Sequence, residues 1–460
     1  MNWLQTQAVQ NPQKLFIQED VYTYSYMDVA EMVRAHSQVL LQEGIKPYDR
    51  ILIYLPGGIQ MAEIILTCFE IGAIANPIST KLTKSERDSI IEKIKPHLII
   101  TSREYNSDLA SYSLPLVYAE DLPNSSSGFK NEYEKNLDDV CTIILTSGTT
   151  GIPKAVQLRY SNFESSCANW NNFLKFKPED QFLCCLPLHH IGGLAVLLRA
   201  LINGFSVNLV TKFQAEIVLR TIQNYPVTII SLVPTMLKRI LDIKGGLEGL
   251  KSLRWILLGG GPSPEYLLDI CIKEKLNIVK VYGMSETCSG TVALKLLDEP
   301  SNKFYAGRPF PGAKVWIEND EIHISGPMVM KGYIGEAETK DTFNSHDLGR
   351  IENDLLYLDV RRKDLIISGG ENINPIEIEE CLMNVSGISD AAVVGVQDDE
   401  WGQKLTAYIV HKSDPLENEL FSRELKKSLS LYKIPKDYIR VSHIPRNELG
   451  KIVYEKLKSL

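Results

Sequence analysis

A segment near residue 150 carries residue types suited to binding phosphate. It reads Thr146-Ser147-Gly148-Thr149-Thr150-Gly151-Ile152-Pro153-Lys154 and follows an apolar stretch at 140–145. Its glycines allow a tight turn and a close backbone approach to a ligand, while hydroxyl groups and the Lys154 ammonium add donors and charge. The spacing differs from a Walker A loop, which requires G-x-x-x-x-G-K-[ST]. The segment therefore predicts a polyphosphate-binding loop, and a plain Ser/Thr/Gly surface turn is the alternative.

Two further turns follow apolar stretches in which we expect strands. Tyr282-Gly283-Met284-Ser285-Glu286-Thr287 places a carboxylate directly after one, where parallel sheets bind ligands. Magnesium bound to ATP needs only one or two carboxylates, so Glu286 suffices, although an isolated loop acid is more often solvated. Gly259-Gly260-Gly261-Pro262 follows the other and lacks the G-x-G-x-x-G spacing of a dinucleotide site. By itself this glycine turn is weak evidence of a ligand.

The order of these segments resembles that of the acyl-adenylate-forming enzymes, which include acyl-CoA synthetases, adenylation domains of peptide synthetases and luciferases. Residues 146–154 resemble the family's phosphate loop at every position, and residues 282–287 resemble its second signature. Arg361-Arg362-Lys363-Asp364, followed by residues 368–373, resembles its hinge region. Pro445-Arg446-Asn447-Glu448-Leu449-Gly450-Lys451 resembles its C-terminal lysine motif. The resemblance covers essentially the whole chain.

The resemblance implies a ligase that uses ATP and Mg²⁺ to activate a carboxylic acid as an acyl-adenylate. The acyl group then passes to a thiol, that of coenzyme A. Catalytic roles fall on Thr146, His190, Glu286 and Lys451, with Glu286 as the magnesium ligand. Nucleotide and cosubstrate binding falls on Thr146, Ser147, Gly148, Thr149, Thr150, Gly151, Lys154, Gly260, Gly261, Tyr282, Gly283, Thr287, Asp347, Arg361, Gly369 and Gly370.

Individual roles follow from the same resemblance. Tyr282 lies near adenine, Thr287 meets phosphate, and Asp347 and Arg361 meet the ribose. Ser345-His346 stands before Asp347 where the family usually has Thr-Gly. A lysine charge suits adenylation because two anions must meet while negative charge grows on pyrophosphate.

The second half-reaction requires a change of domain orientation. The resemblance implies that the C-terminal domain rotates at the position matched by Lys363 and that Gly369-Gly370 then lies along the pantetheine tunnel. The thiol itself needs little acid–base help, because it is partly ionised at neutral pH and intrinsically nucleophilic.

The histidine pair His189-His190 bears on which carboxylic acid is the substrate, because it falls where the family builds its acyl pocket. A metal site is a weak interpretation, since no carboxylate or third histidine lies near in sequence. The pair suits a polar or doubly acidic substrate. Benzoate-type and medium-chain fatty acids remain alternatives, as do a standalone module that loads a carrier protein and a relative that only binds nucleotide.

The elements around these motifs alternate between strand and helix signals, which predicts an α/β fold with parallel sheets. Ser25 and Thr83 begin capping boxes, and short strands and turns dominate 307–359. With the resemblance, we expect an N-terminal domain over residues 1–360, of stacked α/β subdomains plus a β-barrel-like subdomain. A small mobile α+β C-terminal domain should span residues 361–460.

The composition and net charge are typical of a folded protein that acts on small molecules. The 460 residues are 44% hydrophobic and 23% charged, and the net charge of -8 provides no positive field for nucleic acid. The eight scattered cysteines predict reduced thiols, not a disulfide framework or a zinc site. We expect a cytoplasmic protein without a signal peptide or membrane span, and a homodimer is possible.

Overall fold

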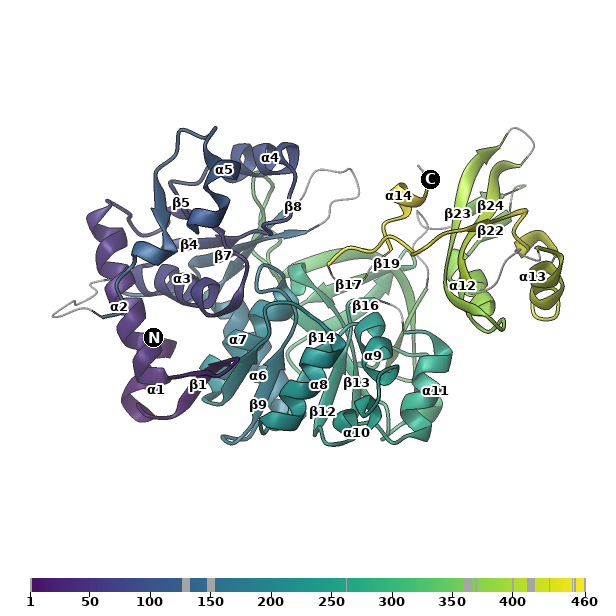
Figure 1. Cartoon of the computed structure of the whole chain (residues 1–460), viewed down its shortest axis with the longest axis horizontal. Helices are drawn as coiled ribbons and strands as arrows, with labels where there is room; N and C mark the ends of the chain where they lie inside the picture. The colour runs from purple at the N-terminus through teal and green to yellow at the C-terminus, as the bar shows by residue number, and fades with distance from the viewer. Residues whose placement is uncertain are drawn as a thin grey trace.

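The computed structural model describes residues 2–125, 133–146, 154–261, 263–359, 366–368, 371–398, 401–411, 418–429, 431–448, 450 and 452–458. A large N-terminal part and a small C-terminal part are distinct in Figure 1. Both mix helices and sheets, so the predicted α/β class is confirmed. Among the described residues, no helix has both the length and the apolar character needed to span a membrane.

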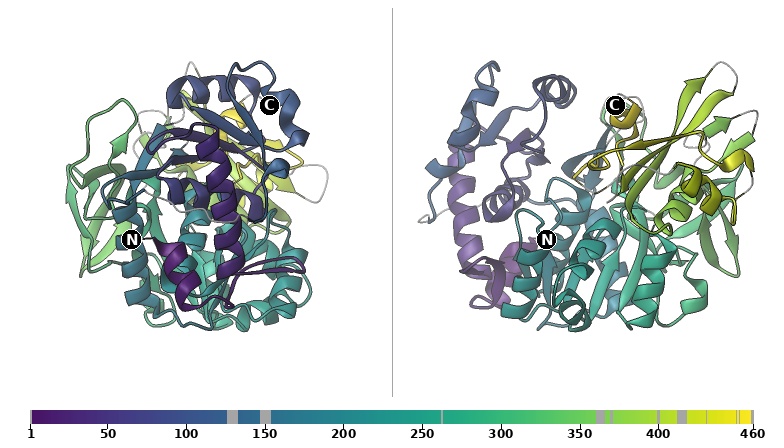
Figure 2. Two further views of the ribbon diagram at one scale, coloured as in Figure 1. Left: turned by 90° about the vertical axis from the view of Figure 1, so that its left-hand side faces the viewer. Right: turned by 45° about the vertical axis from the view of Figure 1, so that its right-hand side comes forward.

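One sheet of the N-terminal part has seven strands in the order β18-β8-β7-β4-β3-β5-β6. Strands β3 to β7 pair in parallel where they meet, and β8 is antiparallel to β7. The predicted capping boxes at Ser25 and Thr83 begin α2 and α4. Helix α2 runs along the end of the molecule farthest from the C-terminal part (Figure 2). The elements are α2 (Tyr26–Gln42), β3 (Arg50–Tyr54), α3 (Gly58–Ile71), β4 (Ile74–Pro77), α4 (Lys84–Ile94), β5 (Leu98–Thr101), α5 (Asn106–Leu109), β6 (Leu116–Tyr118), β7 (Val140–Thr146), β8 (Lys154–Arg159) and β18 (Gly332–Tyr333).

A second sheet has nine strands in the order β15-β14-β13-β12-β11-β9-β10-β1-β2. Its central strands are parallel, and the N-terminal hairpin β1–β2 joins its edge by pairing with β10. The elements are α1 (Trp3–Gln10), β1 (Leu15–Glu19), β2 (Tyr22–Ser25), α6 (Tyr160–Leu174), β9 (Gln181–Cys184), α7 (Ile191–Asn203), β10 (Ser206–Leu209), α8 (Ala215–Asn224), β11 (Ile229–Leu232), α9 (Pro234–Leu241), α10 (Gly246–Lys251), β12 (Trp255–Leu258), α11 (Glu265–Lys273), β13 (Ile278–Met284), β14 (Ser289–Lys295) and β15 (Arg308–Pro309).

The β-rich segment after residue 307 contributes a four-stranded antiparallel sheet, and the C-terminal part has a sheet of its own. The apolar cluster beneath this last sheet contains no residue before Ile366. The elements are β16 (Lys314–Glu318), β17 (Glu321–Ser325), β19 (Thr342–Glu352), β20 (Leu355–Leu358), β21 (Ile366–Ser368), β22 (Glu371–Ile373), α12 (Pro375–Met383), β23 (Ile388–Asp398), β24 (Gly402–His411), α13 (Asn418–Leu425), β25 (Asp437–Arg440) and α14 (Tyr454–Lys458).

The cysteines lie mainly in these cores. All eight are free, and seven are buried. Burial raises the pKa of Cys271 to about 12, so its thiol stays protonated at neutral pH. The buried thiols thus behave as small apolar side chains rather than as nucleophiles.

Candidate active site

The carboxyl ends of four parallel strands place seven of the predicted residues at one edge of the nine-stranded sheet: His190, Gly260, Gly261, Tyr282, Gly283, Glu286 and Thr287. Strands β9, β11, β12 and β13 run in the same direction in adjacent positions. They lead into the histidine pair, the start of α9, the glycine turn and the Glu286 turn, respectively. Open α/β sheets bind ligands at this edge because the loops there diverge and leave a crevice.

Glu286 and Lys154 are connected through a tyrosine. The Glu286 side chain is 8% exposed, and its Oε1 accepts a hydrogen bond of 2.8 Å from the Tyr333 hydroxyl. Burial, reinforced by the Glu286 charge, raises the pKa of Tyr333 well above its usual value, so the hydroxyl keeps the proton that it donates. The Lys154 ammonium lies 4.6 Å from the centre of the Tyr333 ring. The tyrosine therefore holds a carboxylate and a cation at fixed positions.

The first and last residues of the predicted phosphate loop face each other across a strand pair. Thr146 ends β7 and Lys154 begins β8, and the two are paired in register. The intervening residues Ser147, Gly148, Thr149, Thr150 and Gly151 lie outside the described residues. The antiparallel pairing of β7 and β8 thus brings both ends of the loop together. Tyr333 is close by, because its strand β18 pairs with β8 on the side away from β7.

Tyr282 and Asp347 come together from different sheets. The Tyr282 hydroxyl donates to Asp347 Oδ2 at 3.0 Å, and the tyrosine is 8% exposed. Gly283 follows at a bulge in β13, where an added Cβ would lie 2.1 Å from the Ser289 carbonyl oxygen. Only glycine fits there. The predicted adenine-side and ribose-side residues are therefore neighbours.

The departure from Thr-Gly before Asp347 has a local explanation. The Ser345 hydroxyl accepts from the Asp347 backbone N–H at 3.1 Å and donates to the Ile322 carbonyl at 2.8 Å, as a threonine hydroxyl can. His346 has a φ of 56°, which is the left-handed region that glycine occupies freely. Histidine is among the side chains that enter this region more often than most. The substitution thus preserves the turn that presents Asp347.

Thr287 and the glycine turn occupy the same edge. The Thr287 side chain is fully buried, and its hydroxyl accepts from the Met284 N–H at 3.1 Å while lying 2.9 Å from the Ser289 carbonyl oxygen. Its predicted phosphate contact stays a prediction. Gly260 has a φ of 81°, and an added Cβ on Gly261 would meet nothing within 4 Å. Gly261 thus leaves open space beside the expected adenine position.

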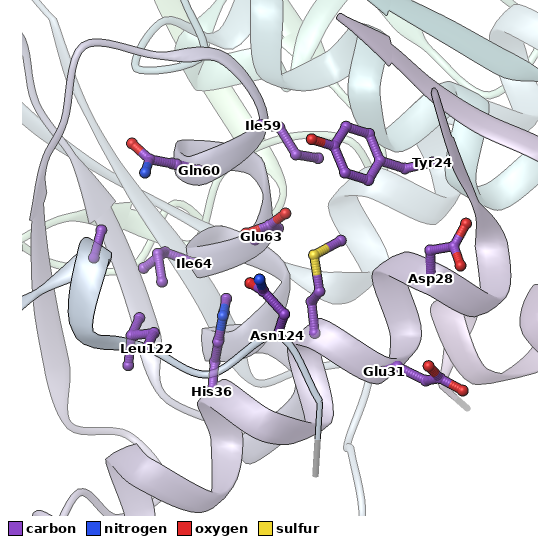
Figure 3. Close-up of a pocket in the computed structure, with 12 residues that line it drawn as sticks. Tyr24, Asp28, Glu31, His36, Ile59, Gln60, Glu63, Ile64, Leu122 and Asn124 are labelled. Atoms are coloured by element: carbon purple, nitrogen blue, oxygen red, sulfur yellow. The ribbon is translucent and has the colours of Figure 1, made fainter. Parts of the chain in front are cut away.

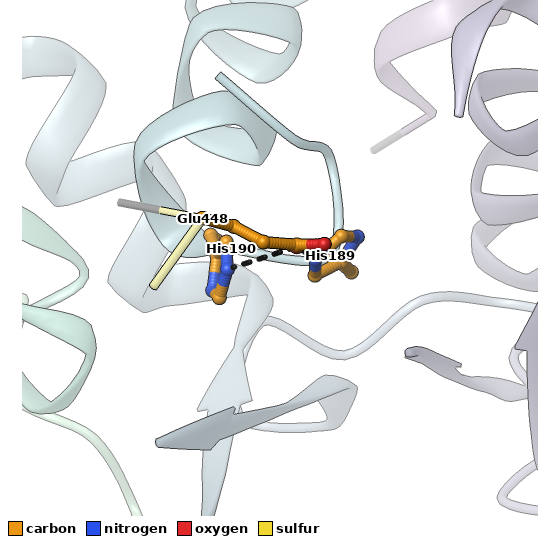
Figure 4. Close-up of side chains that lie close together, drawn as sticks. All are labelled: His189, His190 and Glu448. Atoms are coloured by element: carbon orange, nitrogen blue, oxygen red, sulfur yellow. Dashed lines mark hydrogen bonds and ion pairs between the residues drawn. The ribbon is translucent and has the colours of Figure 1, made fainter. Parts of the chain in front are cut away.

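The histidine pair receives a carboxylate from the far end of the chain. Glu448 Oε2 lies 2.7 Å from His189 Nε2 and 3.8 Å from His190 Nε2 (Figure 4). Its other oxygen, Oε1, lies 2.9 Å from Lys81 Nζ and accepts from the Ser79 hydroxyl at 3.1 Å. Hydrogen bonds from the histidines hold the pKa of Glu448 far below its usual range. No carboxylate lies near the pair in sequence, yet the fold brings Glu448 to it across 259 positions.

The cluster of His189, His190 and Glu448 has the donor types of a metal site. The lysine contact argues for an ion pair instead. An ammonium at 2.9 Å already neutralises the carboxylate, and a divalent cation beside it would add repulsion. We therefore assign these side chains to an ion-pair cluster.

Several predicted residues lie outside the described part of the chain. They are Arg361, Gly369, Gly370 and Lys451, together with the loop residues named above. Four participants have no role predicted from sequence: Ser79, Lys81, Tyr333 and Glu448. Tyr333 carries no motif that could have revealed it, whereas Glu448 stands inside the quoted lysine motif without a function.

A separate cavity of about 480 Å³ lies away from this edge, between α2, α3 and the segment before Asn124. Its lining includes His36 and Glu63, which come from these two helices (Figure 3). Burial, with a smaller effect of the Glu19 charge, raises the pKa of Glu63 to about 8. Burial lowers the pKa of His36 to about 4. Both side chains are therefore mainly uncharged at neutral pH.

The fold and the edge site define an adenylate-forming class of enzyme, and comparison with known proteins agrees. The chain belongs to the AMP-binding enzyme family, whose model matches residues 4–334, and the model of the AMP-binding enzyme C-terminal domain matches residues 377–451. A 2-succinylbenzoate–CoA ligase of Bacillus licheniformis is 35% identical over 475 residues, covering 99% of each chain.

Solved structures show the same likeness. The o-succinylbenzoate CoA synthetase of Bacillus subtilis in complex with its acyl-adenylate intermediate has a TM-score of 0.91, 31% identity, and coverage of 99% of this chain and 98% of that one. The same enzyme in complex with ATP and a magnesium ion has a TM-score of 0.89 and 30% identity, covering 99% of each chain. The predicted family and the acid–thiol ligase class are thereby confirmed.

Proposed function

We propose that the chain is a 2-succinylbenzoate–CoA ligase of menaquinone biosynthesis. It converts 2-succinylbenzoate, ATP and CoA to 2-succinylbenzoyl-CoA, AMP and pyrophosphate. The observation that carries this proposal is the likeness, over nearly the full length of both chains, to an enzyme bound to its acyl-adenylate. The arrangement of Lys154, Tyr333 and Glu286 beside Tyr282 and Asp347 supports it, because these groups suit phosphate, magnesium and a nucleoside.

In the first half-reaction a substrate carboxylate oxygen attacks the α-phosphorus of ATP, and the bond to pyrophosphate breaks. Lys154 and the 146–151 loop hold the phosphates, and Lys451 offsets the charge of the two anions. The Glu286 carboxylate, a hard oxygen donor oriented by Tyr333, fits a magnesium ion. When bound, that ion would neutralise phosphate charge. Tyr282, Asp347 and Arg361 hold the nucleoside.

In the second half-reaction the CoA thiolate attacks the acyl carbonyl carbon, and the carbon–oxygen bond to AMP breaks. We assign Gly369 and Gly370 to the pantetheine path and Lys363 to the hinge. The present arrangement is more similar to the adenylate complex, with a TM-score of 0.91, than to a double mutant bound to a product analogue, with 0.75. This difference supports a rotation of the C-terminal domain between the two steps.

The histidine pair supports a doubly acidic substrate. 2-Succinylbenzoate carries two carboxylates, of which one is activated and the other stays free. His189 Nε2 lies 2.7 Å from the Glu448 carboxylate and His190 Nε2 lies 3.8 Å from it, so we assign Glu448 to His189 and the free carboxylate of the substrate to His190. Imidazole and ammonium groups are suitable donors for an anion. Division into domains 1–360 and 361–460, a cytoplasmic location and a homodimer remain part of the proposal.

A coupled assay of AMP release tests the function. Purified enzyme is given ATP, Mg²⁺ and CoA with 2-succinylbenzoate, benzoate or octanoate, and each thioester is identified by mass. We expect turnover confined to 2-succinylbenzoate. Preference for octanoate or benzoate would contradict the substrate but not the class. Acyl transfer only to a phosphopantetheinyl protein would contradict the CoA ligase.

A further inference from the structure

The loop that precedes Lys451 is anchored on the N-terminal part at two points. At the first, the Glu448 carboxylate reaches Ser79, Lys81, His189 and His190, all of which come from loops after β4 or β9. The side chains of Glu448 and His189 are 23% and 12% exposed, so their contact is largely removed from water, whereas the Lys81 side chain is 72% exposed. In Figure 4 both imidazoles lie beside this one carboxylate.

The second anchor is a close backbone approach. Gly450 has a φ of 72°, and an added Cβ would lie 2.4 Å from Thr235 Oγ1 and 3.2 Å from Val233 Cγ2. Thr235 lies at the start of α9, directly after β11. Strand β11 is next to β9 in the sheet, and β9 leads into the histidine pair. The 446–450 loop, whose Leu449 lies outside the described residues, therefore touches the N-terminal part on both sides of Leu449.

The loop has a defined shape of its own. The Gly450 N–H donates to the Asn447 carbonyl at 2.9 Å, and the Arg446 guanidinium donates to the Gly450 carbonyl at 3.0 Å. Arg446 also pairs with Asp390 of β23 at 2.7 Å, within the C-terminal part. Arg446 thus attaches the loop to the sheet of the C-terminal part, whereas Glu448 and Gly450 contact the N-terminal part.

We propose that Glu448 is a positioning residue that docks the lysine-motif loop on the acyl pocket during adenylate formation. Three residues extend at most about 11 Å, so docking Glu448 restricts where Lys451 can reach. The four contacts must break when the C-terminal domain rotates for thioester formation. Glu448 therefore favours the first half-reaction and opposes departure from it. This inference rests on the proposed two-step function.

The contacts predict opposite effects on the two half-reactions. Glu448→Gln keeps the size of the side chain and can still accept from Ser79, but it removes the negative charge that pairs with Lys81 and contacts the two histidines. We expect adenylate formation to slow about tenfold, because a largely buried charged hydrogen bond is lost. Thioester formation from supplied 2-succinylbenzoyl-adenylate should stay at the wild-type rate or increase, because no docked loop must be released.

The experiment measures both half-reactions by rapid quench in the full-length enzyme. Variants are Glu448→Gln, Lys81→Gln and their combination. Lys81 Nζ pairs with Glu448 Oε1, and its side chain is 72% exposed, so its substitution should slow adenylation less than Glu448→Gln does and add little in the Glu448→Gln background. Glu424→Gln is the matched control, since Glu424 pairs with Lys427 on the surface of the C-terminal part.

Each outcome decides the proposal. A slower first step with an unchanged or faster second step, and a non-additive double variant, supports docking by Glu448. Equal losses in both steps, an unchanged first step, or strictly additive effects of the two substitutions would overturn it. Absence of wild-type turnover with 2-succinylbenzoate would instead contradict the proposed function, so the two failures are distinguishable.

Discussion

Tyr333→Phe tests whether the tyrosine hydroxyl positions the predicted magnesium ligand. The substitution removes one buried hydrogen bond, 2.8 Å long, to the Glu286 carboxylate and keeps the ring that lies 4.6 Å from Lys154 Nζ. A hydrogen bond to a charged group contributes about 1.5–3 kcal/mol. Each factor of ten in rate corresponds to about 1.4 kcal/mol. If the whole effect falls on the transition state, adenylate formation should slow about ten- to a hundredfold.

The assay is exchange of labelled pyrophosphate into ATP at saturating acid, repeated over a range of magnesium concentrations. Tyr333→Leu extends the test, because it also removes the aromatic face under Lys154. A cation–π contact contributes about 0.5–2 kcal/mol, so this variant should be slower still by about two- to thirtyfold.

Tyr305→Phe provides the matched control. The Tyr305 hydroxyl donates to Glu352 Oε2 at 2.6 Å, but this pair is exposed and contacts neither Glu286 nor Lys154 among the hydrogen bonds of the described residues. Its loss should leave exchange unchanged. An exchange rate of Tyr333→Phe within twofold of wild type, in a protein with an unchanged melting temperature, would refute the assignment of Tyr333 as the residue that orients Glu286.

Three further predictions address burial, backbone space and the catalytic lysine. Because the folded pKa of Glu63 is raised to about 8, its contribution to stability is present below pH 4.5 and is lost as the pH rises through 8. Glu63→Gln should therefore stabilise the protein at pH 9 by up to about 5 kcal/mol, measured by urea unfolding, whereas an unchanged pH profile would contradict the burial argument. Gly283→Ala should lower the free energy of unfolding by about 2–4 kcal/mol, because its Cβ would collide with a carbonyl oxygen. Gly261→Ala should keep the melting temperature and raise KM for ATP. Equal melting temperatures for both variants would count against this prediction. Lys451→Ala should nearly abolish adenylate formation yet spare thioester synthesis from supplied adenylate, and quench kinetics showing equal loss of both steps would contradict the two-orientation mechanism.

Local features of the fold were readable from sequence where neighbouring residues decide them. Ser25 with Asp28 and Thr83 with Glu86 form capping boxes whose partners stand three positions apart. The apolar stretch 140–145 became β7, one residue longer than expected, and the apolar stretches before the two further turns became β12 and β13. In contrast, the pairing of β1 with β10 depends on residues about 190 positions apart, and no short-range pattern could indicate it.

For the site, the sequence by itself determined which chemistry is available, because glycine spacing, hydroxyl groups and single charges are properties of short segments. Only the tertiary structure decided which of these groups meet. It joined Glu286 to Lys154 through Tyr333, and it brought Glu448 to His189. These contacts depend on parallel strands ending at a common edge and on where the C-terminal part docks. Both are set by packing between distant segments, which local residue patterns do not encode.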